Sequence, residues 1–409
     1  MVINMSLIVQ KFGGTSVADS KLIFNVAKTV TKAYDENNDV VVVVSAQGDM
    51  TDQLIFKANE INKKGSKREM DMLLSAGEQI SVALVAMAIE KMGYPVVSLL
   101  GWQAGVMTSS TYGSALITKI DPARIRKELD KRNIVIVAGF QGLNKYYDVT
   151  TLGRGGSDTS AVGIAAVLNA DVCRIYTDVD GVYTADPRKV KNARKLSYIS
   201  YDEMLELANM GAQVLNNRSV EIAKKHNIEI EVLSSMEDLP GTVVKEASGM
   251  EKMLISGVAK DDGIARITIM GVPDIPGWAF KIFSKLSSKG INVDIILQST
   301  GGENTKDISF TVREEQLDDA VEILNEYCKS IEGSFVTYDR NVSKVSVVGA
   351  GMESHPGVAA KMFEALFTAQ INIQMIATSE IKISVLLNQN EADKAVIVIH
   401  DTFFDTPAI

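Results

Sequence analysis

Apolar and polar positions alternate between two patterns in the first part of the chain. Continuous β-branched runs, such as residues 40–44 and 134–142, lack polar alternation, which is typical of parallel strands buried on both faces. Between these runs, apolar residues recur at every third or fourth position, as on the buried face of a helix. Strands that alternate with helices predict a three-layer α/β/α sheet domain, which we place at residues 1–246.

Individual elements follow from the same pattern. Residues 161–168 and 213–226 are predicted helices, and the Ser- and Thr-rich stretch after Trp102 is predicted to be a loop. Ser157 and Asp158 stand before the first of these helices, and both side chains are suited to capping it.

The C-terminal region contains an internal repeat. Pro276-Gly277 recurs as Pro356-Gly357 and Asn292 recurs as Asn372, both at an offset of 80 residues. Alternating strands flank each copy, so each copy is predicted to be an α+β module of βαββαβ (ferredoxin-like) type, and two such modules can pack about a pseudo-twofold axis. The predicted ranges are 247–340 for a linker and the first module, and 341–409 for the second.

Composition narrows the class of protein. The 409 residues are 46% hydrophobic and 23% charged with a net charge of −9, which is typical of a soluble globular protein and argues against nucleic-acid or membrane partners. Cys173 and Cys328 are too few for a disulfide framework or a zinc site. The N-terminus lacks the features of a signal peptide, and the longest apolar stretch, 82–89, is too short to span a bilayer. We therefore expect a cytoplasmic protein.

The first candidate for chemistry is the sequence Lys11-Phe12-Gly13-Gly14-Thr15-Ser16. It follows a short buried strand and precedes a long helical pattern, so its glycines expose backbone N–H groups where a phosphate can bind. Lys11 adds a positive charge from the end of the strand. The lysine precedes the glycines, so the motif is not a Walker P-loop, and a tight turn without a ligand is the alternative reading.

Two further stretches carry polar side chains in unusual settings. Arg154 lies among three glycines before a predicted helix, where a guanidinium can hold a carboxylate or phosphate with two hydrogen bonds. Glu78 lies on a very apolar helix, and burying an unpaired carboxylate is costly, so a ligand or an ion-pair partner is expected. The aspartates around Gly181 do not match a calcium loop, because Pro187 stands where a glutamate is required.

Taken in order, these motifs resemble the aspartate kinases, a family within the amino-acid kinase superfamily that carries paired C-terminal ACT domains. The resemblance implies ATP- and Mg²⁺-dependent phosphorylation of L-aspartate to 4-phospho-L-aspartate, which opens the lysine, threonine, methionine and diaminopimelate pathways. It also implies feedback control by lysine, threonine or both through the ACT modules. The matching segments are residues 11–16, 45–51, 75–78, 151–159 and 177–188, with Gln298 and Ser379-Glu380 in the tail.

The resemblance also assigns roles to individual residues. The catalytic residues would be Lys11 and Asp158. ATP would contact Lys11, Phe12, Gly13, Gly14, Thr177, Asp178, Tyr183, Asp186 and Arg188. L-Aspartate would contact Ser45, Thr51, Glu78, Arg154, Gly155, Gly156 and Ser157. The effector would contact Asp274, Gly277, Asn292, Val293, Asp294, Gln298, Asn372, Ile373, Ser379 and Glu380. No residue is assigned as a metal ligand.

The chain departs from the family pattern at one place. Gln213 stands where many members have a lysine that contacts the nucleotide, and Asn216-Asn217-Arg218 replaces the usual His-Pro. Two other functions are considered: a kinase for another amino acid, such as glutamate or acetylglutamate, and a non-catalytic amino-acid sensor. A homodimer or higher homo-oligomer through the C-terminal modules is expected, because exposed sheet edges often pair.

Overall fold

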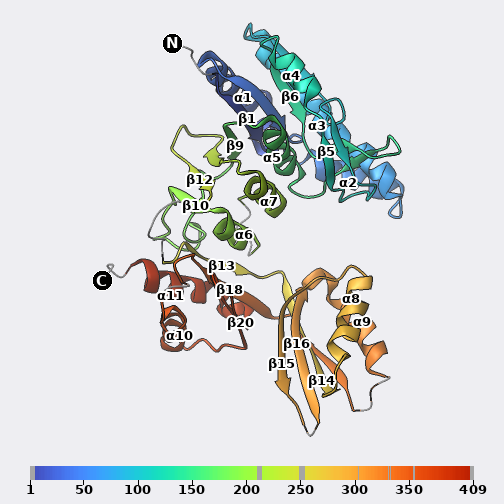
Figure 1. The fold of residues 1–409 in the computed structure, drawn as a ribbon, viewed down its shortest axis with the longest axis vertical. Helices are drawn as coiled ribbons and strands as arrows, with labels where there is room; N and C mark the ends of the chain where they lie inside the picture. The colour runs from blue at the N-terminus through green and yellow to red at the C-terminus, as the bar shows by residue number, and fades with distance from the viewer. Residues whose placement is uncertain are drawn as a thin grey trace. The chain divides into compact units, whose positions relative to one another are not determined.

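The computed structural model describes residues 5–209, 214–247, 254–302, 304–329, 331, 333–352 and 355–405. The chain forms two compact units, coloured along the chain in Figure 1. Unit 1 contains residues 1–183 and 195–250, and unit 2 contains residues 184–194 and 251–409. The short segment Thr184–Arg194 therefore leaves unit 1, joins unit 2 and returns.

Unit 1 is built on an eight-stranded sheet with the order β10-β12-β11-β9-β1-β2-β6-β3. All neighbouring strands are parallel except β11 and β12. The parallel centre of the sheet confirms the interpretation of the β-branched runs. The strands are β1 (Leu7–Phe12), β2 (Asp39–Val44), β3 (Val96–Leu99), β6 (Ile134–Ala138), β9 (Val172–Thr177), β10 (Tyr198–Ser200), β11 (Ile230–Ser234) and β12 (Thr242–Lys245).

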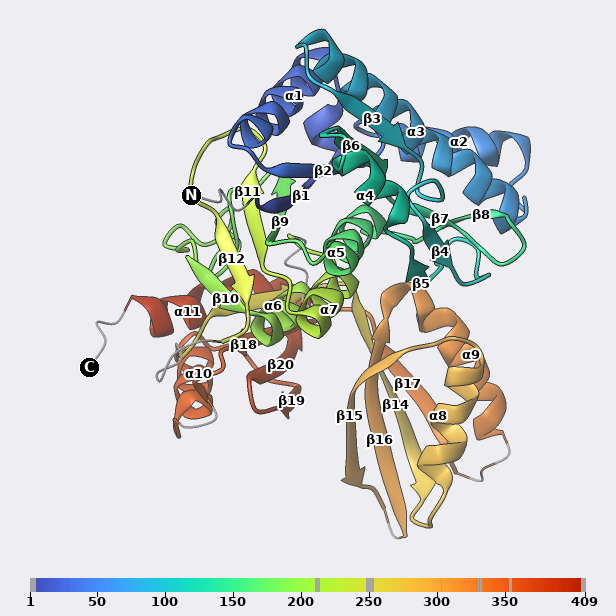
Figure 2. The same ribbon diagram turned by 45° about the horizontal axis from the view of Figure 1, so that its top comes forward.

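Helices cover both faces of the central strands, as the three-layer prediction requires (Figure 2). α1 and α3 pack on one face, where Val26 and Val85 meet Val42 in the main hydrophobic core. α5 contacts β1, β2 and β9, and its residues are almost all buried. The helices of unit 1 are α1 (Ser20–Asp35), α2 (Met50–Ile61), α3 (Lys67–Lys91), α4 (Ala123–Leu129), α5 (Gly156–Leu168), α6 (Tyr201–Asn209) and α7 (Asn217–His226).

The 25-residue helix α3 is long and apolar enough to cross a membrane by length and composition alone. Half of its most apolar window is buried inside the unit, where Val82, Val85 and Ile89 join the core beside β2 and β6. A core helix of a soluble domain passes the same test, so α3 is explained by its packing.

A small second sheet in unit 1 corrects two predictions. The stretch after Trp102 is not a single loop, because it contributes two short strands to a sheet with the order β5-β4-β7-β8. The predicted strand 134–142 is also two strands, since the chain leaves the main sheet at Phe140, whose φ is 66°. Both misreadings concern three- or four-residue strands that are too short to show a clear pattern. The strands are β4 (Val106–Thr108), β5 (Ile117–Ile120), β7 (Gln141–Leu143) and β8 (Val149–Thr151).

The helix predicted at 213–226 begins later than expected. α7 starts at Asn217, because the Asn216 side chain accepts a hydrogen bond from the Arg218 N–H and so caps the helix. Gln213, the departure from the family pattern, lies outside the described residues.

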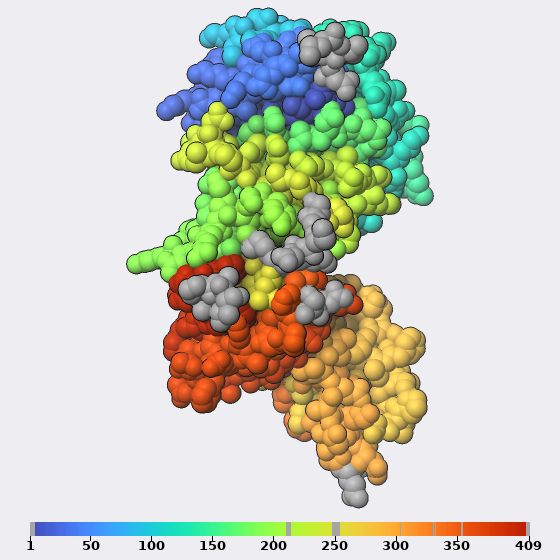
Figure 3. All heavy atoms as spheres, turned by 60° about the vertical axis from the view of Figure 1, so that its left-hand side comes forward, coloured from blue at the N-terminus to red at the C-terminus, as the bar shows by residue number. Residues whose placement is uncertain are grey.

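Unit 2 contains the two repeated modules, which are orange and red in Figure 3. The first module has the predicted βαββαβ order and a four-stranded sheet with the order β15-β16-β14-β17. Its helices pack on one face of that sheet around Phe310 and Leu324. Its elements are β14 (Ile264–Pro273), α8 (Trp278–Ser288), β15 (Val293–Thr300), β16 (Thr305–Arg313), α9 (Leu317–Cys328) and β17 (Phe335–Asp339).

The second module differs from the first in one strand. Its sheet has the order β13-β18-β20-β19, and the edge strand β13 comes from the stretch before the first module. A copy of β17 is therefore replaced by a strand that we had included in the range 247–340. Its elements are β13 (Gly257–Asp261), β18 (Val342–Val348), α10 (Val358–Thr368), β19 (Met375–Thr378), β20 (Lys382–Asn388) and α11 (Ala392–Phe404).

The two modules share a small core of their own. Ile295 of β15 and Met375 of β19 lie in it together with Ile264 and Val342. Ile295 and Met375 occupy equivalent positions of the repeat, 80 residues apart. Equivalent residues meeting in one core is the arrangement expected of two modules related by a pseudo-twofold axis.

Candidate active site

Four loops of unit 1 meet at one edge of its main sheet. β1 lies between β2 and β9 and is parallel to both, with Phe12 beside Val44 and Tyr176. Val44 in turn lies beside Ala138 of β6. The loops that follow these strands begin at Gly13, Ser45, Gly139 and Asp178, so all four start at the carboxyl edge, where open α/β sheets bind ligands.

The glycine turn after β1 packs tightly on the loop after β2. A side chain on Gly14 would place its Cβ 2.5 Å from the Ala46 carbonyl oxygen, so only glycine fits there. The Gly48 N–H also donates to the Gly14 carbonyl at 3.0 Å. A Cβ on Gly13 would lie 3.6 Å from the Lys11 Nζ, which places the ammonium group directly beside the turn.

Lys11 forms an ion pair with Asp158. Their Nζ and Oδ1 atoms are 2.6 Å apart, and the two side chains are only 11% and 12% exposed. The pair joins the end of β1 to the first turn of α5. Such a charge pair, largely removed from water, interacts more strongly than one on the surface.

The start of α5 corrects the predicted capping role of Ser157 and Asp158. The helix begins at Gly156, after Gly155 in a left-handed conformation with φ 70°, and no side chain caps it. Asp158 lies inside the first turn, where its negative charge is favourable beside the helix N-terminus. Ser157 contacts the end of β6, because a Cβ on Gly139 would lie 2.8 Å from its side chain.

Glu78 is buried at the same edge of the sheet. Its side chain lies on α3, its residue is 3% exposed, and its Oε1 accepts a hydrogen bond of 3.1 Å from the Ala46 N–H. Burial raises the pKa of Glu78 to about 7. Its Oε2 has no hydrogen-bond partner, and no basic side chain pairs with it within the described part of the chain. This arrangement is suited to a cationic ligand.

Arg154 stands in the loop between β8 and α5. Gly153 and Gly155 on either side both have left-handed backbones, with φ 79° and 70°. The Arg154 side chain is exposed, and no ion pair to it is found among the described residues. Ser45 begins the Ala46 loop and Thr51 lies in the first turn of α2 after it, and both are half-buried.

The stretch that was predicted to contact ATP is divided between the two units. Thr177 is the last residue of β9 at the sheet edge, where its Oγ1 donates to the Asp178 carboxylate at 3.0 Å. Tyr183 donates from its hydroxyl to Asp180 at 2.8 Å, also in unit 1.

Asp186 and Arg188 belong to unit 2. The Arg188 guanidinium donates to both carboxylate oxygens of Asp186, at 3.0 and 2.9 Å. The predicted ATP contacts therefore lie partly in unit 1, with Thr177, Asp178 and Tyr183, and partly in unit 2, with Asp186 and Arg188.

The residues predicted to contact an effector lie on and around two edge strands of unit 2. On β15, Asp294 pairs with Lys344, whose side chain is 6% exposed, and Gln298 is exposed. Asp274 pairs with Lys306 at 2.7 Å, and Gly277 begins α8 in a left-handed conformation with φ 101°. The others occupy the start of β15, with Asn292 and Val293, and the flanks of β19, with Asn372, Ile373, Ser379 and Glu380.

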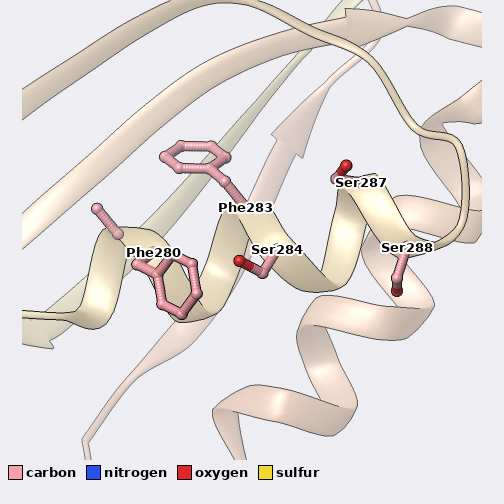
Figure 4. Close-up of a pocket in the computed structure, with 6 residues that line it drawn as sticks. Phe280, Phe283, Ser284, Ser287 and Ser288 are labelled. Carbon is pink, nitrogen blue, oxygen red and sulfur yellow. The ribbon is translucent and has the colours of Figure 1, made fainter.

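A surface hollow in unit 2 does not coincide with these residues. It follows one side of α8, where Phe280 and Phe283 lie beside serine side chains (Figure 4). The predicted effector residues therefore do not line it. The hollow is lined by Ala279, Phe280, Phe283, Ser284, Ser287 and Ser288.

Sequence reasoning missed a second buried carboxylate in unit 1. Asp71 is fully buried on α3 and accepts hydrogen bonds from Thr151 and from the Gly113 N–H. A signal was available, because Asp71 precedes Glu78 by seven residues and so lies on the same face of the helix.

Comparisons with known proteins agree with this architecture. Residues 6–234 match the model of the amino acid kinase family, and residues 267–327 and 345–403 match that of the ACT domain. The chain therefore belongs to the amino acid kinase family, with two ACT domains after the kinase domain.

Individual relatives narrow the class further. The aspartokinase of Geobacillus stearothermophilus is 50% identical over 400 residues, covering 98% of this chain and 97% of that protein. The structure of E. coli aspartokinase III in complex with aspartate and ADP, called the R-state, matches 97% of this chain and 100% of that one, with 25% identity and a TM-score of 0.82. The T-state of the same enzyme, in complex with lysine and aspartate, has a TM-score of 0.75.

The chain is thus an enzyme of the aspartokinase class. Its reaction is the ATP-dependent phosphorylation of the side-chain carboxylate of L-aspartate, the first step of the lysine, threonine and methionine pathway, under end-product control through the ACT domains. The relatives give no support to a glutamate or acetylglutamate kinase, or to a non-catalytic sensor.

Proposed function

We propose that Lys11 and Asp158 form the phosphoryl-transfer centre of this aspartate kinase. The observation that carries the proposal is their ion pair of 2.6 Å beside the Gly13-Gly14 turn. The nucleophile is a carboxylate that is already anionic at neutral pH, so the reaction requires no general base. Catalysis then consists of alignment and charge neutralisation, in which Lys11 lies between two anions and Asp158 orients its ammonium group.

L-Aspartate would bind between α3 and the β8–α5 loop. Arg154 would hold its α-carboxylate with paired hydrogen bonds, and Glu78 would hold its ammonium group. The unpartnered Oε2 of Glu78 supports this role, because a buried carboxylate oxygen gains from a cationic ligand. Ser45, Thr51, Gly155, Gly156 and Ser157 would line the same space.

The nucleotide would occupy the loops after β1 and β9. Lys11, Phe12, Gly13 and Gly14 would lie at the transferred phosphate, and Thr177, Asp178 and Tyr183 along the rest of ATP. Phe12 stacks on Tyr176 with ring centroids 4.5 Å apart, so the two rings pack together at the ends of β1 and β9.

Mg²⁺ fits this site as a partner of the ATP phosphates. Within the described residues, no three His, Cys, Asp or Glu side chains gather to hold a metal, and Mg²⁺ in kinases requires only one or two carboxylates besides phosphates. Asp158 is the acidic side chain beside Lys11, so it would be the carboxylate available to the ion. Bound Mg²⁺ would neutralise charge on the phosphates.

The paired ACT domains would bind the inhibitory amino acid. L-Lysine is the first candidate, since the T-state structure of E. coli aspartokinase III contains it, and L-threonine is the second. Asp294, Gln298 and the residues flanking β19 would contact it. The exposed edges of β15 and β19 support a homodimer or higher homo-oligomer through this unit. Two free, buried cysteines, Cys173 and Cys328, support a reducing cytoplasmic location.

The roles of the substrate residues are tested by trapping the acyl phosphate with hydroxylamine. Wild-type protein, Arg154→Ala and Glu78→Gln are supplied with ATP, Mg²⁺ and aspartate, glutamate or N-acetylglutamate. We expect hydroxamate from aspartate alone, and a KM for aspartate at least about tenfold higher in both variants, with an unchanged KM for ATP. Glu203→Gln is the control, because Glu203 is a buried carboxylate of unit 1 that hydrogen-bonds Ser200. An unchanged KM in Arg154→Ala and Glu78→Gln contradicts the assigned roles.

A further inference from the structure

The loop that carries Arg154 is held from the α3 side by Asp71. The Asp71 Oδ1 accepts from the Thr151 hydroxyl at 2.7 Å, and its Oδ2 accepts from the Thr151 N–H at 3.0 Å. Both oxygens also lie 3.0 Å from the Gly113 nitrogen. No cation pairs with this fully buried carboxylate in the described part of the chain, so its partners are Thr151, at the end of β8, and the backbone of Gly113, between β4 and β5.

The same loop is held from the other side by α7. The Arg218 guanidinium donates to the carbonyl oxygens of Leu152, at 2.7 Å, and Ala115, at 2.9 Å. Burial lowers the pKa of Arg218, and no carboxylate forms an ion pair with it among the described residues. The Arg218 guanidinium therefore donates its paired hydrogen bonds to backbone carbonyl oxygens and not to an acidic side chain.

Asn216 completes the contact from α7. Its Nδ2 donates to the carbonyl oxygen of Arg154 at 3.1 Å, while its Oδ1 accepts from the Arg218 N–H at 3.0 Å. Its side chain also fills the space beside Gly155, where a Cβ would lie 2.3 Å from the Nδ2. Asn216 thus joins the start of α7 directly to the residue that carries the proposed substrate contact.

We propose that Asp71, Asn216 and Arg218 are positioning residues that fix the backbone around Arg154 and so set its guanidinium for the substrate carboxylate. This inference rests on the proposed role of Arg154. The two left-handed glycines give the loop a sharp path but supply no side chains to hold it. The three side chains supply that hold at Thr151 and Leu152, which precede the arginine, and at the carbonyl of Arg154 itself.

The first test is Asn216→Asp, with substrate kinetics and thermal unfolding measured on the full chain. Aspartate keeps the acceptor that caps α7 but loses the donor to the Arg154 carbonyl. We expect kcat/KM for aspartate to fall about tenfold, with an unchanged KM for ATP and an unchanged Tm. Asn388→Asp is the matched control, because Asn388 makes the same type of cap in unit 2 and should leave these constants as they are. An unchanged kcat/KM for aspartate in Asn216→Asp overturns the proposal.

The second test asks whether the effect passes through Arg154. In an Arg154→Ala background, Asn216→Asp and Arg218→Lys should cause almost no further loss, since the group they position is gone. Losses that multiply in the double variants overturn the proposal and assign the two residues to fold maintenance. If Arg154→Ala alone leaves the KM for aspartate unchanged, the proposed function of Arg154 has failed instead, which is a different outcome from a silent Asn216→Asp.

Discussion

The ion pairs at the two candidate sites of this enzyme differ in how far their charges are removed from water. In unit 1, Lys11 and Asp158 are about nine-tenths buried and face each other at a sheet edge that is covered by helices. In unit 2, the acidic partners of the comparable pairs, Asp274 and Asp294, are each 49% exposed. Phosphoryl transfer benefits from charges removed from water, whereas a sensor must leave its charges open to a ligand that comes and goes.

The sheets explain this contrast. The central strands of unit 1 are parallel and covered on both faces, so polar groups concentrate where these strands end. The strands of unit 2 are antiparallel and carry helices on one face, so whole edge strands such as β15 stay exposed. The following predictions use the contrast, from the largest expected effect to the smallest.

Lys11→Ala should remove turnover, whereas the same change at Lys344 should not. Both lysines are largely buried, with side chains 11% and 6% exposed, and each pairs with an aspartate. Loss of Lys11 removes a charge from the transition state, so we expect kcat to fall at least about a hundredfold. Hydroxamate formation measures this effect, and circular dichroism shows whether the fold is retained. If a folded Lys344→Ala loses as much kcat as Lys11→Ala does, the assignment of catalysis to unit 1 alone is wrong.

Glu78 should make the ligand-free protein less stable as the pH rises. Its pKa in the folded protein, about 7, lies above its ordinary value of 4.5, so the folded state holds the proton more tightly. Stability is therefore fully retained below about pH 4.5 and is lost as the pH rises through 7, by about 3 kcal/mol in total. Denaturant unfolding of wild type and Glu78→Gln between pH 5 and 8 tests this, because the difference in free energy should grow with pH. A constant difference would show that Glu78 does not titrate in this range.

Asp294→Asn should leave kcat unchanged and weaken inhibition by lysine or threonine about tenfold. The substitution removes the charge that would meet the effector's ammonium group and also ends the pair with Lys344. Inhibition curves for each amino acid, separately and together, measure the effect. Asp318→Asn is the control, because Asp318 forms an exposed pair with Arg340 in the same module. If lysine or threonine inhibits Asp294→Asn as strongly as wild type, Asp294 does not contact the effector.

His400 should make unit 2 less stable as the pH falls. This is opposite in direction to the effect of Glu78, and smaller. It is fully buried on α11 beside Asp401 and Asp405, with Arg194 also near, and its Nε2 lies 2.9 Å from the Thr184 Oγ1. Burial lowers its pKa, so the neutral ring contributes stability that is present above pH 6.5 and is lost as the pH falls through its folded pKa. His400→Gln should flatten this loss in thermal unfolding between pH 7 and 5. An identical pH slope in the variant would contradict the assignment.

Much of the fold follows from the sequence because its signals are long. The run 40–44 and the constant offset of the repeat identified the parallel sheet and the two modules, since both patterns extend over many residues. The short strands β4 and β8 were missed, because three residues cannot show a period. The replacement of a copy of β17 by β13 was also hidden, since strand order is a property of distant pairing.

The candidate site was likewise predicted where its sequence signal is local, and was missed where it depends on residues far apart in the chain. The glycine turn and the acidic side chain on an apolar helix are local features, and Lys11 and Glu78 were found from them. The pairing of Lys11 with Asp158 joins residues 147 positions apart, which no local pattern reveals. Asp71 has a local signal in its spacing from Glu78, but its partners, Gly113 and Thr151 at the end of β8, lie far along the chain.

The central claim is that unit 1 carries out phosphoryl transfer and unit 2 binds the inhibitor. It is tested most directly by calorimetric titration of L-lysine and L-threonine into Lys11→Ala, which should be inactive, and Asp294→Asn, which should be insensitive to the inhibitor. Lys11→Ala should bind the effector with wild-type affinity although it makes no hydroxamate. Asp294→Asn should make hydroxamate at the wild-type rate although it binds the effector weakly. Loss of effector binding in Lys11→Ala, or loss of turnover in Asp294→Asn, would contradict the account.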